Sequence, residues 1–132
     1  MSGIEWVVDA QGCSAEALRD SRLLRSLFDK LILDLRLRPV GVTQWHQFPG
    51  SGGITGLCLL SESHLACHTF PEHGSLCLNL FCCVSREAWD FESHLREMFF
   101  ATSVQVRTIE RSYCSTATSK AEAVLAIGGQ NG

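Results

Sequence analysis

The stretch ITGLCLLSESHLACHTFPEHGSLCLNLFCC, residues 54–83, decides the fold of this chain. Its two outer segments are apolar runs, and short polar links join them to a middle segment that alternates. Alternation in a strand sends successive side chains to opposite faces, which predicts one face with Leu65, Cys67 and Thr69 and another with His64, Ala66, His68 and Phe70. Parallel neighbours need a crossover of a dozen or more residues, so links this short predict antiparallel hairpins.

The segments before this stretch predict a strand, a helix and a further strand. Residues 4–10 form a short β-branched run, and Ser14 is a candidate N-cap for a helix over 15–37, which Pro39 ends. Apolar residues follow at helical spacing within it: Leu24, Leu27, Phe28, Leu31 and Leu35. Residues 40–48 are rich in strand formers, and the Gly-rich run 49–53 is typical of a loop.

The segments after it predict one more helix and one more strand. Ser85 is a candidate N-cap for a helix whose apolar stripe is Ala88, Phe91, Leu95, Met98 and Phe99, and residues 103–112 alternate as a strand. The order β-α-β-β-β-β-α-β predicts an α+β, two-layer sandwich, mainly antiparallel, with two helices on one face of the sheet. The other face is left bare, and such a face favours a homodimer.

Composition excludes several classes of protein. The chain has 132 residues, enough for one domain, and its net charge of −3 gives no basic footprint for nucleic acid. No apolar run is long enough for a membrane span, and the N-terminus lacks a secretory pattern, so we expect a cytoplasmic protein. Seven cysteines without a signal peptide predict small buried side chains rather than disulfides.

The segment 61–74, SESHLACHTFPEHG, concentrates reactive side chains, and three interpretations compete. A metal site is disfavoured because Cys67 points away from the face that carries His64 and His68. A nucleophilic site would use Ser63, although no nucleophile-elbow pattern surrounds it. From the residues alone, a sheet histidine at His68 and a turn serine at Ser63 remain open.

Motifs in this region resemble the prokaryotic type of S-adenosylmethionine decarboxylase. The resemblance rests on "ESH" at 62–64, "HTFPE" at 68–72 and a cysteine twenty residues after Ser63, and it is densest from Trp45 to Cys83. It implies a decarboxylase domain of 1–114 and a proenzyme that cuts itself between Glu62 and Ser63, giving pieces 1–62 and 63–132. Residues 115–132 are expected to form a loosely held tail.

The resemblance also implies the chemistry of the site. Ser63 would become a pyruvoyl group that binds the substrate amine as a Schiff base and serves as an electron sink. His68 would accept a proton during processing, from a strand position just beyond the nucleophile, and Thr55 would stabilise the oxyanion. Cys83 would donate the proton that follows decarboxylation, and alternation in a regular strand would place it on the face of Cys77, Asn79 and Phe81, away from Cys82.

Substrate recognition is implied in the same way, for S-adenosylmethionine on the route to spermidine. Phe48 would stack on the adenine and Glu72 would hold the ribose. Neighbouring protomers of a homodimer would complete each site, and no metal is expected.

Several positions depart from the family pattern, among them Asn79, where aspartate is usual, Val84, where glycine is usual, and Glu5, which lies near the usual Gly-Arg-His segment. An extra acid such as Glu5 near the pocket would suit a cationic amino acid, so arginine or ornithine is an alternative substrate. The other alternative is a regulatory relative that does not process itself.

Overall fold

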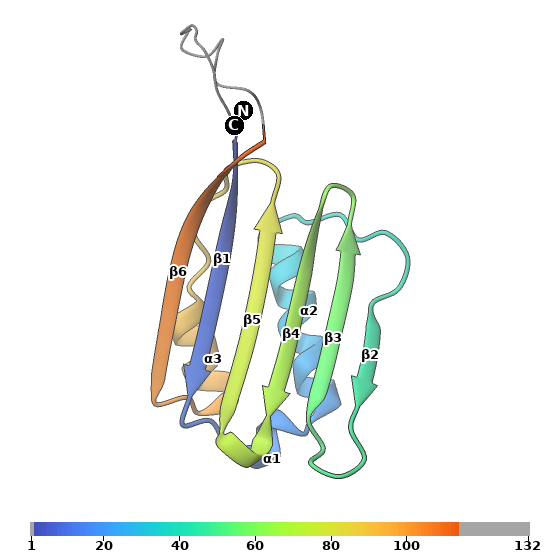
Figure 1. Cartoon of the computed structure of the whole chain (residues 1–132), viewed down its shortest axis with the longest axis vertical. Helices are drawn as coiled ribbons and strands as arrows, with labels where there is room; N and C mark the ends of the chain where they lie inside the picture. The colour runs from blue at the N-terminus through green and yellow to red at the C-terminus, as the bar shows by residue number, and fades with distance from the viewer. Residues whose placement is uncertain (1, 114–132) are drawn as a thin grey trace, which may run out of the picture.

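The computed structural model describes residues 2–113. It shows a single antiparallel sheet with helices on one face. The six strands lie in the order β2-β3-β4-β5-β1-β6 (Figure 1). The elements follow the chain as β1 (Ser2–Gln11), α1 (Ala15–Leu18), α2 (Ser21–Asp34), β2 (Gln44–Gln47), β3 (Ile54–Leu60), β4 (Ser63–Phe70), η1 (Pro71–His73), β5 (Ser75–Cys82), α3 (Phe91–Phe99) and β6 (Ser103–Ser112). The predicted α+β two-layer architecture is confirmed.

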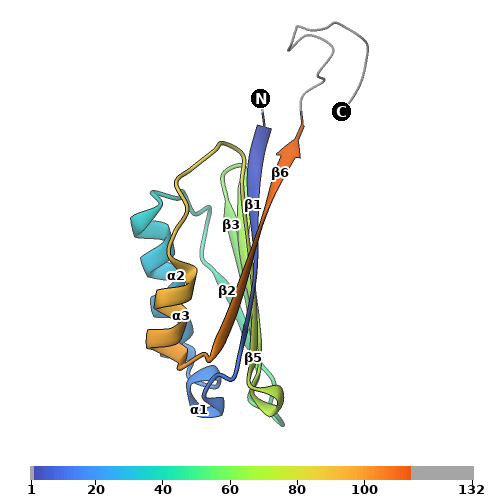
Figure 2. The same cartoon turned by 90° about the vertical axis from the view of Figure 1, so that its left-hand side faces the viewer.

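Figure 2 shows α1, α2 and α3 on the same side of the sheet, and within residues 2–113 no α-helix covers the other face. The apolar stripe of α2 packs into the core through Leu24, Leu27, Phe28 and Leu31. Burial alternates along β4 as predicted, because Leu65, Cys67 and Thr69 are buried while His68 and Phe70 are exposed. The open face of the sheet therefore carries the side chains of the opposite parity in β4, including His64 and His68.

The predicted helix over 15–37 is wrong, since the structure has two helices there. Asp20 breaks the run because its carboxylate accepts hydrogen bonds from the backbone N–H groups of Arg22 and Leu23 and so caps α2. The first helix, with its N-cap at Ser14 as predicted, is only α1. Three helices, rather than two, consequently cover the sheet.

The second predicted helix begins later than Ser85, at Phe91, with Asp90 as the N-cap. The segment before it runs across the end of α2, where Arg86 donates to the carbonyl of Leu35 and the indole of Trp89 donates to Asp34 at 2.9 Å. Those tertiary bonds hold the segment in an irregular conformation where local propensity alone favours a helix.

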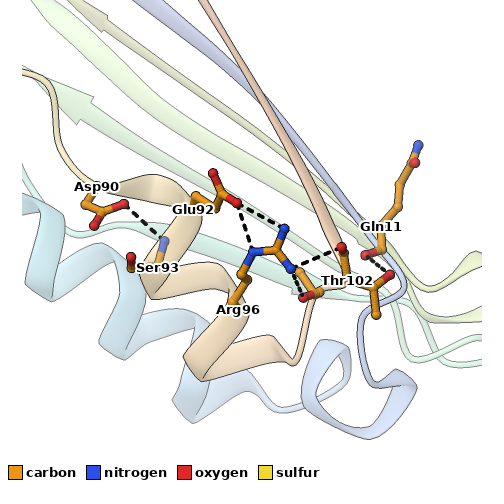
Figure 3. Close-up of polar contacts among 7 residues, drawn as sticks. Gln11, Asp90, Glu92, Ser93, Arg96 and Thr102 are labelled. Atoms are coloured by element: carbon orange, nitrogen blue, oxygen red, sulfur yellow. Dashed lines mark hydrogen bonds and ion pairs between the residues drawn. The ribbon is translucent and has the colours of Figure 1, made fainter.

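Polar contacts join α3 to the adjacent strands (Figure 3). Arg96 pairs with Glu92 one turn earlier and donates to the carbonyl of Thr102 at 3.1 Å, while the hydroxyl of Thr102 faces the carbonyl of Gln11. These contacts fix α3 against the ends of β1 and β6. Strand β6 matches its predicted range, whereas the strand predicted over 40–48 is shortened to β2. The predicted tail, 115–132, lies outside the described residues.

Candidate active site

The predicted site residues lie in two groups at opposite ends of β4. The pocket cluster is defined as Phe48, Thr55, His68 and Glu72, and the turn cluster as Glu62, Ser63 and Cys83. In Figure 1 the turn between β3 and β4 lies at one end of the sheet, and η1 with the β2–β3 loop lies at the other. A single chain thus does not bring all seven residues together.

The pocket cluster surrounds a cavity of about 430 Å³, whose lining includes all four of its members. Thr55 and His68 are directly paired across β3 and β4, and Thr55 Oγ1 lies 3.1 Å from His68 Nδ1. Phe48 is half-exposed beside the cavity and meets the ring of His46 edge-on at 4.7 Å. Glu72 enters from η1, which Pro71 begins and Gly74 ends in the left-handed conformation that glycine adopts readily. An aromatic ring, a carboxylate and a hydroxyl–imidazole pair therefore share one recess.

The turn cluster is held by the tight β3–β4 hairpin. Leu60 pairs with Ser63, so Ser61 and Glu62 alone form the turn, and Ser63 is half-exposed as the first residue of β4. The Glu62 side chain hydrogen-bonds the thiol of Cys83, just beyond the end of β5. The hydroxyl of Tyr113 also donates to the Cys83 carbonyl at 2.8 Å. The carboxylate, the hydroxyl and a thiol consequently gather around the Glu62–Ser63 bond.

Cys82 and Cys83 face different environments, as strand alternation predicts. Cys82 is buried under the helices, whereas Cys83 is partly exposed and follows the parity of the open face. Partial burial and then the neighbouring Glu62 carboxylate raise the pKa of the Cys83 thiol. This thiol therefore stays protonated at neutral pH, as a proton donor requires.

A polar chain that we did not predict crosses the open face near the turn cluster. His64 Nε2 lies 2.8 Å from Asn79 Oδ1, Asn79 Nδ2 donates to Glu5 at 2.6 Å, and Arg111 pairs with the same carboxylate. The hydrogen bond from Asn79, followed by Arg111, lowers the pKa of Glu5. The sequence marked Asn79 and Glu5 only as departures from a pattern, because their proximity depends on the pairing of β5, β1 and β6.

Within residues 2–113, no group of three histidine, cysteine or acidic side chains is arranged to hold a metal ion. None of the helices in the same range is both long and apolar enough to cross a membrane.

Comparison with known proteins matches the profile of the S-adenosylmethionine decarboxylase family to residues 4–112. The S-adenosylmethionine decarboxylase proenzyme of Moorella thermoacetica is 34% identical over 80% of this chain and 83% of its own length. The proenzyme of the same name from Syntrophomonas wolfei is 30% identical over 80% and 82%. The crystal structure of the adenosylmethionine decarboxylase from Aquifex aeolicus superposes with a TM-score of 0.73 at 22% identity, covering 86% of this chain and 93% of that one, which shows a shared fold.

Proposed function

The chain belongs to the S-adenosylmethionine decarboxylase family, and on that premise we propose that it cuts itself between Glu62 and Ser63 and then decarboxylates S-adenosylmethionine for spermidine synthesis. One observation gives the strongest support for the proposed decarboxylase function. The Thr55–His68 pair lies in the same cavity as Phe48 and Glu72, so proton-transfer groups adjoin groups suited to a nucleoside.

Self-cleavage starts at the turn cluster. The Ser63 hydroxyl attacks the Glu62 carbonyl, which turns the amide into an ester, and Thr55 donates a hydrogen bond to the oxyanion. His68 then removes the Ser63 α-proton, and the Glu62 carboxylate leaves with residues 1–62. Hydrolysis of the remaining piece, 63–132, gives a pyruvoyl group at its N-terminus and releases ammonia.

The residues around Ser63 fit a pyruvoyl group, because the serine whose α-carbon would become the ketone carbon is half-exposed at a turn, beside a thiol that stays protonated. When formed, the group supplies an electron sink for the electrons released with CO₂. Cys83 donates the proton that replaces the carboxylate, and its open-face position gives it the access that Cys82 lacks.

The pocket cluster binds the substrate. The ring of Phe48 stacks on the adenine, and the Glu72 carboxylate accepts hydrogen bonds from the ribose hydroxyls. Neither contact would serve a bare amino acid. Glu5, which suggested arginine or ornithine as an alternative, is occupied by Arg111 and Asn79 and has no unpaired charge for a cationic side chain.

Each site is completed by two copies of the chain. Five residue steps separate Ser63 from His68 along β4, which at about 3.3 Å a step is roughly 16 Å. Alternation also puts the two side chains on opposite faces. This spacing argues against a short proton transfer from His68 within one chain and supports a histidine that is supplied by a partner chain.

The open face supplies the surface for that partner. Leu57 and Leu59 on β3 are at least half-exposed there, and Val40 and Val42 extend the apolar surface beyond it. Two copies related by a two-fold axis across this face bring the turn cluster of one chain to the pocket cluster of the other. Exposed apolar side chains and the divided site both support a homodimer.

Intact-mass measurement of the purified protein tests the proposed processing. We expect two pieces, 1–62 and a 63–132 piece whose N-terminus is blocked to Edman sequencing. Labelled CO₂ release is then compared for S-adenosylmethionine, arginine and ornithine. A protein that stays uncut after long incubation would contradict the enzyme proposal. A kcat/KM a hundredfold higher for either amino acid, about 2.7 kcal/mol, would contradict the proposed substrate alone.

Replacing Cys83 with alanine should leave maturation intact but lower turnover by about 10²- to 10⁴-fold, because the proton donor is lost. Cys82→Ala is the matched control, since that thiol is buried on the other face, and it should mature and turn over within a few-fold of wild type. The measurement is single-turnover CO₂ release from each matured variant. If Cys82→Ala showed the loss instead, the assigned proton donor would be wrong.

A further inference from the structure

His64 has no role in the proposed reaction so far, although it follows the scissile bond directly. Its ring lies on the open face, 5.9 Å from the ring of Phe81 and nearly parallel to it. Across the β4–β5 pair, its Nε2 atom faces Asn79 Oδ1 at 2.8 Å. One side of the ring is thereby held by stacking and one nitrogen by a hydrogen bond.

The direction of that hydrogen bond follows from Glu5. The Glu5 side chain is 15% exposed, and its carboxylate is paired with Arg111 and has a lowered pKa, so it is ionised at neutral pH and can only accept hydrogen bonds. The Asn79 atom facing Glu5 must therefore be the Nδ2 donor, which turns Oδ1 toward His64. An amide oxygen also only accepts, so His64 Nε2 must carry the proton.

A neutral imidazole with its proton on Nε2 has a free lone pair on Nδ1. Nδ1 is the ring nitrogen nearer the main chain, and the preceding residue is Ser63. Alternation gives Ser63 and His64 opposite faces in a regular strand, but Ser63 is the last paired residue before the turn and is half-exposed rather than buried. The nitrogen with the free lone pair thus belongs to the residue that directly follows the serine that must lose a proton.

Arg111 completes the arrangement from the far strand. Its guanidinium pairs with Glu5 and lies 5.7 Å from the centre of the Phe81 ring, on which His64 also stacks. The four polar residues Arg111, Glu5, Asn79 and His64 therefore connect β6, β1, β5 and β4 in one continuous row. In this row the base, His64, is oriented by the amide of Asn79, which is itself oriented by the charge of Glu5. A catalytic triad orients its base in the same way.

We propose that His64 is the base for the first step of self-cleavage and that Asn79, Glu5 and Arg111 are positioning residues that fix its tautomer. This rests on the proposed function. The Ser63 Oγ–H bond breaks and its proton goes to His64 Nδ1 while Oγ bonds to the Glu62 carbonyl carbon. The carbon–nitrogen bond then breaks, and His64 returns the proton to the Ser63 nitrogen. The step is an isomerisation that needs no other reactant, and His68 of the partner acts only afterwards.

Self-cleavage kinetics test the role of His64. His64→Gln keeps a donor for Asn79 but has no basic nitrogen, so cleavage should slow by about 10²- to 10⁴-fold. His94→Gln is the matched control, because His94 stacks on Trp89 on the helix side of the sheet and should cleave at the wild-type rate. Added imidazole should partly restore cleavage of His64→Ala. A misfolded chain could not be rescued in this way, so the rescue separates loss of the base from loss of folding. Wild-type cleavage by His64→Gln, or no rescue by imidazole, would overturn the proposal.

The tautomer is measured separately, in the uncut Ser63→Ala chain, from imidazole ¹⁵N shifts. His64 should carry its proton on Nε2, and Asn79→Leu should abolish this preference and slow cleavage about tenfold when made in the wild-type chain. A proton on Nδ1, or an unchanged cleavage rate in Asn79→Leu, would overturn the positioning row. If the wild-type chain never cleaves, the proposed function fails. The ¹⁵N measurement of the His64 tautomer would still test, independently, whether Asn79, Glu5 and Arg111 orient the ring.

Discussion

Ser63→Ala is expected to leave one uncut chain of 132 residues that releases no CO₂ from S-adenosylmethionine. The alanine has no hydroxyl to attack the Glu62 carbonyl, and no pyruvoyl group can form without that oxygen. Every later step depends on the group, so the loss of activity should be complete rather than partial. Intact mass and labelled CO₂ release on the same sample measure both effects.

Ser61→Ala is the matched control for this variant, because Ser61 lies in the adjoining β3–β4 turn but outside the scissile bond. It should be cut and should turn over substrate. Cleavage of Ser63→Ala at the same bond would show that another nucleophile acts, and the assignment of Ser63 would fail.

Co-expression of Ser63→Ala with His68→Ala should restore cleavage that His68→Ala alone lacks. In a mixed dimer, the His68→Ala chain retains its own Ser63 and receives an intact His68 from the partner. The other site has lost both groups, so only the His68→Ala chain should be cut. A mass tag on one chain identifies which chain matures, and the yield should rise from background to most of the mixed dimers.

Co-expression of His68→Ala with Thr55→Ala is the control for this test. Both changes lie in the pocket cluster, so each mixed site lacks one of the two residues and cleavage should not recover. If Ser63→Ala and His68→Ala also fail to complement each other in mixed dimers, or if the active protein is a monomer by light scattering, the two-chain site is wrong.

The sequence predicted those features that depend on neighbouring residues. Alternation along β4 separated Leu65 and Cys67 from His68, and the same rule distinguished Cys82 from Cys83. Short polar links predicted the hairpins. The exceptions were the starts of α2 and α3. Asp20 caps α2 inside the run that was predicted as one helix, and α3 has its N-cap at Asp90 rather than Ser85, after a segment in which Arg86 and Trp89 contact α2.

The motifs named the reactive residues, but only the tertiary structure decided their distances. In sequence, Ser63 and His68 are close neighbours; in an extended strand they are about 16 Å apart, because each residue adds its full rise. Conversely, Glu5, Asn79 and Arg111 are far apart in the chain and share one row of hydrogen bonds. Sequence separation is a poor measure of distance in an antiparallel sheet, where strand extension separates near residues and cross-strand register joins remote ones.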